Sequence, residues 1–173
     1  MANISNVRMG ACSLTFNGVD CGHTLGGVKL TNTRKLTDLK VDKYGDSVID
    51  KVLTANDLVI SCKVAEPVIS LIKVAMPEGT YLTGTAGTQL GIAAGEGASM
   101  RASAAVLTLH PFARSATDYT EDVTIYLAVP TANPVLNYDT NGQRVFDLEF
   151  SALVSEAYTP GRRLGHIGPV NIS

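Results

Sequence analysis

The sequence predicts a mainly β domain with one short helix. Several segments alternate apolar and polar residues, which is the period of a half-buried strand, and the clearest of them cover residues 11–17, 58–64 and 145–154. Turn signals such as Asn17-Gly18 separate the alternating segments. Only residues 67–76 show the spacing of an amphipathic helix. The length of 173 residues fits a single domain, which we expect to span residues 1–173.

In the first half of the chain, two strands are expected to flank a charged loop. A strand covers residues 27–33, and its alternation continues through residues 34–42. Residues 48–53 form either a short strand or a loop that lies on a neighbour. Residues 58–64 form the next strand, with four apolar side chains on one face: Leu58, Ile60, Cys62 and Val64.

The predicted helix is short. Pro67 suits the first position of a helix, because proline lacks the N–H that would be unpaired there. Apolar residues follow at helical spacing: Val68, Leu71, Ile72 and Ala75. Met76-Pro77 ends the helix, since proline disfavours helical geometry in the residue before it.

In the second half, residues 78–97 are expected to form a loop rich in glycine, threonine and alanine. Strands are predicted over residues 102–110 and 123–128, followed by the long last strand. We expect an N-terminal arm over residues 1–10 and a C-terminal arm over about 156–173.

The composition argues against several classes of function. A formal net charge of −2 does not fit an overall basic nucleic-acid binder. Charged residues make up 17% of the chain, below the ordinary roughly 25%, which indicates that partners cover part of the surface. Three cysteines without a CxxC pair are expected to be core thiols. No signal peptide or membrane-spanning run is evident, so we expect synthesis in the cytoplasm and no membrane binding by this chain.

Three patterns could indicate an enzyme or a ligand site. The glycine-rich loop lacks the Gly-Lys-[ST] ending of a phosphate-binding loop. His23, His110 and His166 could serve nucleophilic catalysis with a thiol, but no cysteine or serine lies in a nucleophile elbow. Aspartates spaced by four residues (Asp38, Asp42, Asp46 and Asp50) do not match a calcium-binding loop, and interspersed lysines favour salt bridges. We therefore expect no catalytic site, cofactor or metal.

The loop over about residues 34–53 is the feature most indicative of function. A long connection of this kind inside a compact domain is usually functional or disordered. Interleaved apolar residues argue against disorder. We interpret the loop as a surface that contacts another protein. The residues assigned to it are Lys35, Asp38, Lys40, Asp42, Lys43, Tyr44, Asp46, Asp50 and Lys51.

About residues 11–155 resemble the major tail tube protein of long-tailed, non-contractile bacteriophages. The most specific part is the run GHTLGGVKLTNTRKLTDLKVDKYGDSVIDKVLTANDLVISCKVAE, with VDKYG followed by VIDKVLT. A short helix, PVISLIKVAMP, follows this run. Later segments, LTLHP, DYTEDVTIYLAVP and RVFDLEFSAL, also resemble the second half of the family.

The resemblance implies a β-sandwich or barrel of two packed antiparallel sheets with one flanking helix at about 67–76. It also implies hexameric rings that stack into a tube, with the charged loop reaching the adjacent ring. The expected partners are other copies of the chain, a tape-measure protein and other tail proteins. Viral DNA would pass through the lumen without specific binding. The expected location is the virion tail, after assembly in the bacterial host cytoplasm.

A tube for DNA should have an acidic or neutral lining, because a basic groove would hold the phosphates. The polar face of the last strand supplies the candidates Asp147, Glu149 and Ser151. The other interpretation is that this face is ordinary outer surface. Alternatives for the whole protein are another ring-forming tail or neck protein, a tube subunit similar to that of type VI secretion, a small β-barrel that binds a ligand, and a hydrolase.

Overall fold

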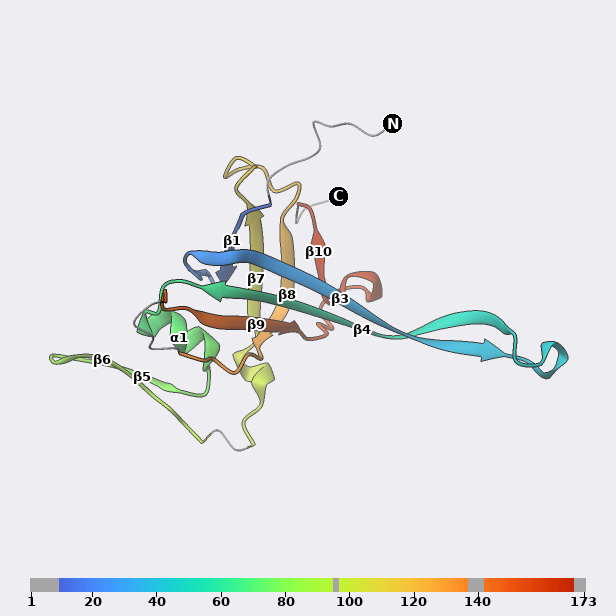
Figure 1. Cartoon of the computed structure of the whole chain (residues 1–173), viewed down its shortest axis with the longest axis horizontal. Helices are drawn as coiled ribbons and strands as arrows, with labels where there is room; N and C mark the ends of the chain where they lie inside the picture. Colours follow the sequence, from blue (N-terminus) through green and yellow to red (C-terminus); the bar gives the residue numbers. More distant parts are fainter. Residues whose placement is uncertain (1–9, 95–96, 137–141, 170–173) are drawn as a thin grey trace.

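The computed structural model describes residues 10–94, 97–136 and 142–169, and it is mainly β as predicted (Figure 1). Within these residues, eight strands form one large antiparallel sheet and two more form a separate hairpin, with one short α-helix. The strands of the large sheet follow the order β2-β1-β7-β8-β9-β4-β3, and β10 pairs with β8.

The elements of the large sheet are β1 (Cys12–Phe16), β2 (Val19–Asp20), β3 (Thr24–Lys40), β4 (Val48–Val64), β7 (Ala105–Pro111), β8 (Val123–Pro130), β9 (Phe146–Ala152) and β10 (Gly165–Ile167). The remaining elements are α1 (Ile69–Ala75), β5 (Thr80–Gly84), β6 (Gly87–Gly91) and 3₁₀ turns at Asp42–Tyr44, Met100–Ser103 and Pro160–Arg162.

The large sheet bends over onto itself. Strands β8 and β9 pair only over Ala128–Ala152, Val129–Ser151 and Pro130–Phe150. Beyond these pairs, β7 and β8 run across β3, β4 and β9 (Figure 1). The ring of Phe16 in β1 lies 4.9 Å from that of Phe150 in β9, although β7 and β8 separate these strands in the sheet. The expectation of two packed sheets is therefore met only in coarser form, by one continuous sheet with two crossing layers.

The core lies between the two layers. Its largest fully buried side chains come from both layers and include Leu14, Ile60, Leu107, Ile125, Phe146, Leu148 and Phe150. The apolar face predicted for residues 58–64 is confirmed, and that predicted for residues 145–154 is confirmed within β9, because the apolar side chains of both strands are buried in alternation. Val154, which was placed on the same face, follows β9 and is exposed. We call the part of the chain that shares this core the body.

The described strands do not close into a barrel. One end of the sheet is the short β2 beside β1, and the other end is β3, whose outer side pairs with no strand among the described residues. A free strand edge presents unpaired N–H and C=O groups. The body therefore has an edge on which another strand could pair.

Helix α1 covers one end of the sheet, close to where it was predicted. It begins at Ile69 with Val68 as N-cap, so Pro67 lies just outside the helix rather than at its first position. Its buried side chains are Leu71, Ile72 and Ala75. The Lys73 Nζ donates to the carbonyl oxygens of Pro77 (2.6 Å) and Gly79 (2.5 Å), which supports the end of the helix.

Two segments predicted as irregular are ordered. Within residues 78–97, the expected loop is instead the β5–β6 hairpin, which projects from the body beside α1 (Figure 1). The expected C-terminal arm folds back onto β8 as far as the structure describes it, to Pro169. The expected N-terminal arm lies outside the described residues except for Gly10.

The returning C-terminal segment covers the outer face of β8, whose other face lies in the core, so both faces of this strand are buried. Thr124 and Tyr126 alternate with the apolar Val123, Ile125 and Leu127 in the sequence, yet both are buried. The ring of Tyr158 stacks on that of Tyr126 with centroids 3.5 Å apart. The Tyr126 hydroxyl lies 2.9 Å from Nδ1 of His166 and accepts a hydrogen bond from Arg162 at 3.3 Å. This cluster fixes residues 158–166 on the outer side of β8.

Candidate assembly interface

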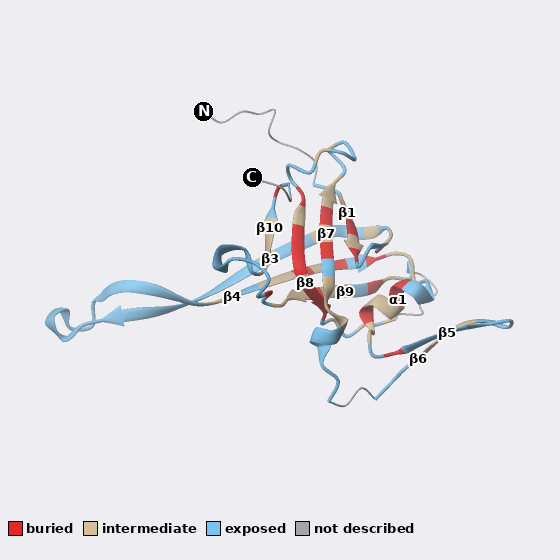
Figure 2. Cartoon of the chain, turned by 180° about the vertical axis from the view of Figure 1, so that it is seen from behind, coloured by how far each residue is buried: buried red, intermediate tan, exposed pale blue. Residues whose placement is uncertain are grey.

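Strands β3 and β4 continue far beyond the body as a two-stranded hairpin. Every residue from 32 to 54 is exposed (Figure 2). The predicted loop over residues 34–53 is therefore wrong in its local structure, because both strands continue and only residues 41–47 form the turn. We call residues 34–53 the arm and residues 41–47 its tip. The arm contains every residue that the sequence assigned to the contact surface.

Five of the nine charged residues of the arm form ion pairs, four of them with one another. Lys51 stands opposite Asp38 in the register, and its Nζ lies 2.5 Å from the Asp38 carboxylate. Two further ion pairs join Lys40 to Asp46 (3.4 Å) and Lys35 to Asp57 (3.5 Å). Exposed pairs of this kind stabilise a fold by only ~0–1 kcal/mol each. All three pairs lie within the β3–β4 hairpin, so none of them joins the arm to another strand of the body.

Two tip residues are not engaged in this way. The Nζ of Lys43 lies 5.7 Å from the centroid of the Tyr44 ring. Asp42 starts the 3₁₀ turn and has no ion-pair partner within the described part of the chain. In the part of the arm outside the tip, Asp50 accepts a hydrogen bond from the backbone N–H of Lys51 (2.7 Å).

The arm also exposes many large apolar side chains. The exposed fractions are 53% for Leu36, 57% for Tyr44 and 52% for Leu53. The other members of this set are Leu39, Val41, Val48, Ile49 and Val52. A hairpin of two strands is at best marginally stable alone in water, and an exposed apolar surface of this kind marks an interaction site. The arm therefore has the chemistry of a surface that a partner covers.

The predicted lumen residues lie together on the outer face of the layer formed by β3, β4 and β9. Glu149 stands opposite Ser61, Asp147 opposite Lys63, and Ser151 opposite Val59. The hydroxyl of Thr131 bonds to the side chains of Glu149 (3.1 Å) and Ser151 (3.2 Å). These contacts order the face without removing it from solvent.

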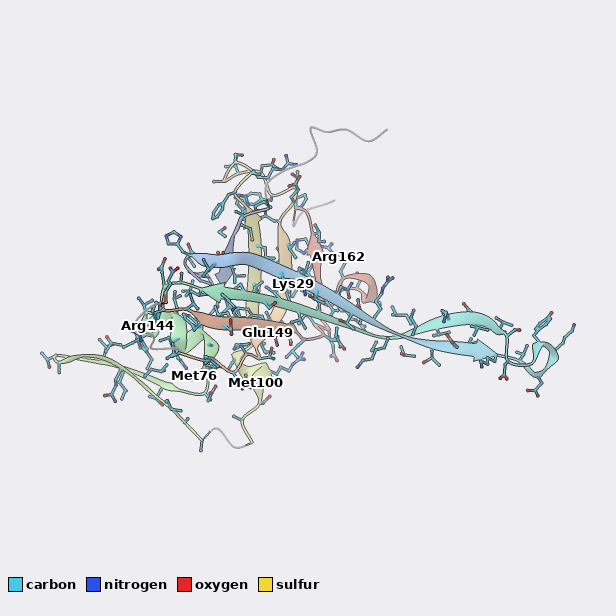
Figure 3. The ribbon with its side chains drawn as sticks, viewed as in Figure 1. Lys29, Met76, Met100, Arg144, Glu149 and Arg162 are labelled. Carbon is cyan, nitrogen blue, oxygen red and sulfur yellow. The ribbon has the colours of Figure 1, made fainter. Side chains whose placement is uncertain are left out.

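The same face carries lysines that the sequence assignment missed. Lys29 in β3 stands opposite Ser61 in β4, and β4 also carries Lys63. Figure 3 shows Lys29 and Glu149 on this layer. A shallow concavity is lined by both lysines together with Asp147 and Glu149. The charges are balanced, so the face is closer to neutral than to acidic. The sequence alone could not place these lysines beside Asp147 and Glu149, because that requires the pairing register of β3, β4 and β9.

The histidines considered for catalysis lie beside three different partners. The Nε2 of His23 lies 3.5 Å from Glu66, and the Nδ1 of His110 lies 2.7 Å from the buried Asp122. His166 contacts Tyr126 as described above. The cysteines are all free thiols, and burial raises the pKa of Cys21 and Cys62 to about 12.

No group of three or more His, Cys, Asp and Glu side chains among the described residues is arranged to hold a metal ion. In the same part of the chain, no helix is both long enough and apolar enough to cross a membrane. Comparison of the sequence with protein-family models and with curated proteins gives no match.

Proposed function

We propose that this chain is a structural subunit that assembles with copies of itself into stacked rings, as the tail tube of a bacteriophage. The observation that carries the proposal is the arm, which exposes a row of large apolar side chains on a hairpin without a core. Such a hairpin gains stability only when another surface covers it. The resemblance of the sequence to tail tube proteins supports the same reading.

The free edge of β3 supports a ring. Pairing the outer side of β3 with a strand of the next copy would satisfy its backbone groups and remove the exposed edge. Repeating that contact around an axis closes a ring, and the sheets of the ring then form the barrel that a single chain lacks. Sixfold symmetry is the expectation that follows from the resemblance.

The near-neutral face of β3, β4 and β9 is proposed as the lining of the lumen. Lysines balanced by carboxylates give no net attraction to DNA phosphates, so a DNA molecule could slide past without being bound. The assembled tube would hold a tape-measure protein during assembly and later conduct DNA into the host. The proposed location is the virion tail, assembled in the bacterial cytoplasm.

Electron microscopy of the purified chain tests the proposal. The wild-type protein should form rings or tubes. A variant in which residues 40–49 are replaced by a two-residue Asn-Gly turn should stay folded, because every deleted residue is exposed, but should form no tubes. Normal tubes from this variant would overturn the stacking role of the arm. A persistent monomer of the wild-type chain whose melting temperature rises with a small ligand would favour a ligand-binding protein instead.

A related ring-forming tail or neck protein, or a subunit of a secretion-type tube, would share the ring and its free strand edge. Single rings that never stack at any concentration would favour a neck or terminator protein.

A further inference from the structure

A groove lies on the body where the arm begins. It runs between the part of β3 and β4 at the base of the arm (Leu30, Asn32, Leu53, Asn56 and Leu58) and the returning C-terminal segment, which lie side by side in Figures 1 and 2. Its apolar lining includes Leu30, Leu53, Leu58, Val123, Val154, Leu164 and Ile167. Its volume is about 570 Å³, enough for several side chains.

The groove is apolar but has a positive charge at its rim. Four of its apolar residues (Leu30, Leu53, Val154 and Ile167) are exposed in the single chain. Arg163 also lines it, no acidic residue does, and Arg163 has no ion-pair partner among the residues that the structure describes. Figure 3 shows the neighbouring Arg162 on this side of the molecule.

The tip of the arm has the complementary properties. Tyr44 is flanked by the exposed Val41 and Val48, which together give an apolar projection. Asp42 lies in the same turn and is the acidic group that has no ion-pair partner among the described residues. An exposed tyrosine with apolar neighbours is a typical anchor of a protein interface.

We propose that the tip of one copy binds in the groove of a second copy, with Tyr44 among the apolar side chains and Asp42 facing Arg163. A chain cannot make this contact with itself, because its own tip and groove lie at opposite ends of the arm. Residues 32 to 40 of β3 span about 26 Å at ~3.3 Å per residue, and the tip extends this to roughly 30 Å. The inference rests on the proposed function and adds the surface that receives the arm.

This contact predicts the repeat of the polymer. A tip-in-groove contact is heterologous, so each copy binds the next with the same displacement and the chain of contacts is open-ended. The displacement between successive copies equals the distance from the groove to the tip of one chain plus the length of the side chains that enter the groove. The expected spacing of successive rings is therefore roughly 30–40 Å.

Charge reversal tests the pairing. Asp42→Arg and Arg163→Asp should each raise the concentration needed for polymerisation by about tenfold or more, because an attraction becomes a repulsion. The two changes in one chain should restore polymerisation. The matched control combines Asp50→Arg with Arg163→Asp. Asp50 is an exposed acidic residue of the arm outside the tip, so this combination should not restore polymerisation. Failure of the double variant to recover, or unchanged assembly of Arg163→Asp, would overturn the proposal.

Cross-linking gives a second measurement that does not require tubes. In a Cys12→Ser background that keeps Tyr44, a chain with Lys43→Cys and Asn56→Cys, treated with a short bismaleimide, should give a ladder of covalent multimers. Each single variant should give none, and neither should Lys43→Cys combined with Tyr81→Cys, which lies on the β5–β6 hairpin.

The two proposals can fail separately. Tubes without a ladder and without charge rescue would leave the proposed function standing and would overturn the groove as acceptor. A ladder from a protein that forms only short oligomers would support the groove and count against the tube.

Discussion

Strand β4 has two different environments along its length. In the body it buries Ile60 and Cys62 against strands from the other layer, whereas in the arm it exposes Val52 and Leu53. The hydrogen-bonded pairing with β3 is continuous across this boundary apart from bulges. Pairing with β3 is therefore common to both regions. Only the body part of β4 also pairs with β9 on its other edge, and only there are its side chains covered. The body carries its own partner surface, and the arm is built for one on another molecule.

The largest expected difference between the two regions is in the cost of removing an apolar side chain. Phe150→Ala should lower the free energy of unfolding by about 3–5 kcal/mol, because Phe150 is fully buried and packs on Phe16. Leu53→Ala in the arm should change it by less than about 0.5 kcal/mol. Urea denaturation measures both. An equal cost at the two sites would show that the arm has a core of its own.

A smaller effect is expected where β10 joins β8. A Cβ on Gly165 would lie 2.2 Å from the carbonyl oxygen of Thr124 and 3.1 Å from Cα of Ile125, so the two strands would have to separate. Gly165→Ala should therefore cost ~1–3 kcal/mol. Gly161→Ala is the control, since a Cβ there meets nothing within 4 Å. Matching denaturation midpoints for the two variants would mean that β10 adds little to the body.

The C-terminal segment should also respond to pH. Burial lowers the pKa of His166, and the positive charge of Arg162 lowers it further. The neutral imidazole is thus favoured in the fold, where it contacts the Tyr126 hydroxyl. Its stabilising contribution should be complete above about pH 6.5, the ordinary value, and should be lost as the pH falls through the lowered pKa of the folded state.

An NMR titration of His166 and hydrogen exchange at β10 would follow this change, while the amides of the arm should show no corresponding transition. A His166 pKa above the ordinary value would contradict it.

The smallest effect is expected from the ion pairs of the arm. Lys51→Ala removes the contact with Asp38, but both side chains are about half exposed. The free energy of unfolding should change by less than ~0.5 kcal/mol, and less still in high salt. Polymerisation should weaken measurably, because the pair aligns the strands that carry Tyr44. A loss of more than ~1 kcal/mol in the unassembled chain would show that the arm contributes to the stability of the body.

The core strands were readable from the sequence because alternation reports burial on one face. The apolar faces of residues 58–64 and of β9 within residues 145–154 were predicted correctly for this reason. The arm was predicted as a loop although alternation continues through residues 34–42, because charged residues occur at close spacing along it. Neither face of the arm is buried, so alternation there does not report burial. Bulges at Lys35/Leu36 and Leu39/Lys40 shift the pattern further.

Other differences came from contacts between distant residues. Tyr126 and Tyr158 are far apart in the sequence, and nothing local indicates that they stack. The β5–β6 hairpin consists largely of Gly and Thr, a composition that is typical of loops. The lysines beside Asp147 and Glu149 became visible only through the register of three strands.

Hydrogen exchange before and after assembly tests the central claim most directly. In the unassembled chain, amides of β4 in the body should exchange slowly, and those over residues 48–53 should exchange fast. In tubes, the amides of residues 48–53 should become protected while the amides of the body change little. Arm amides that are equally protected in both states, or that remain unprotected in tubes, would contradict an arm stabilised by a neighbouring copy.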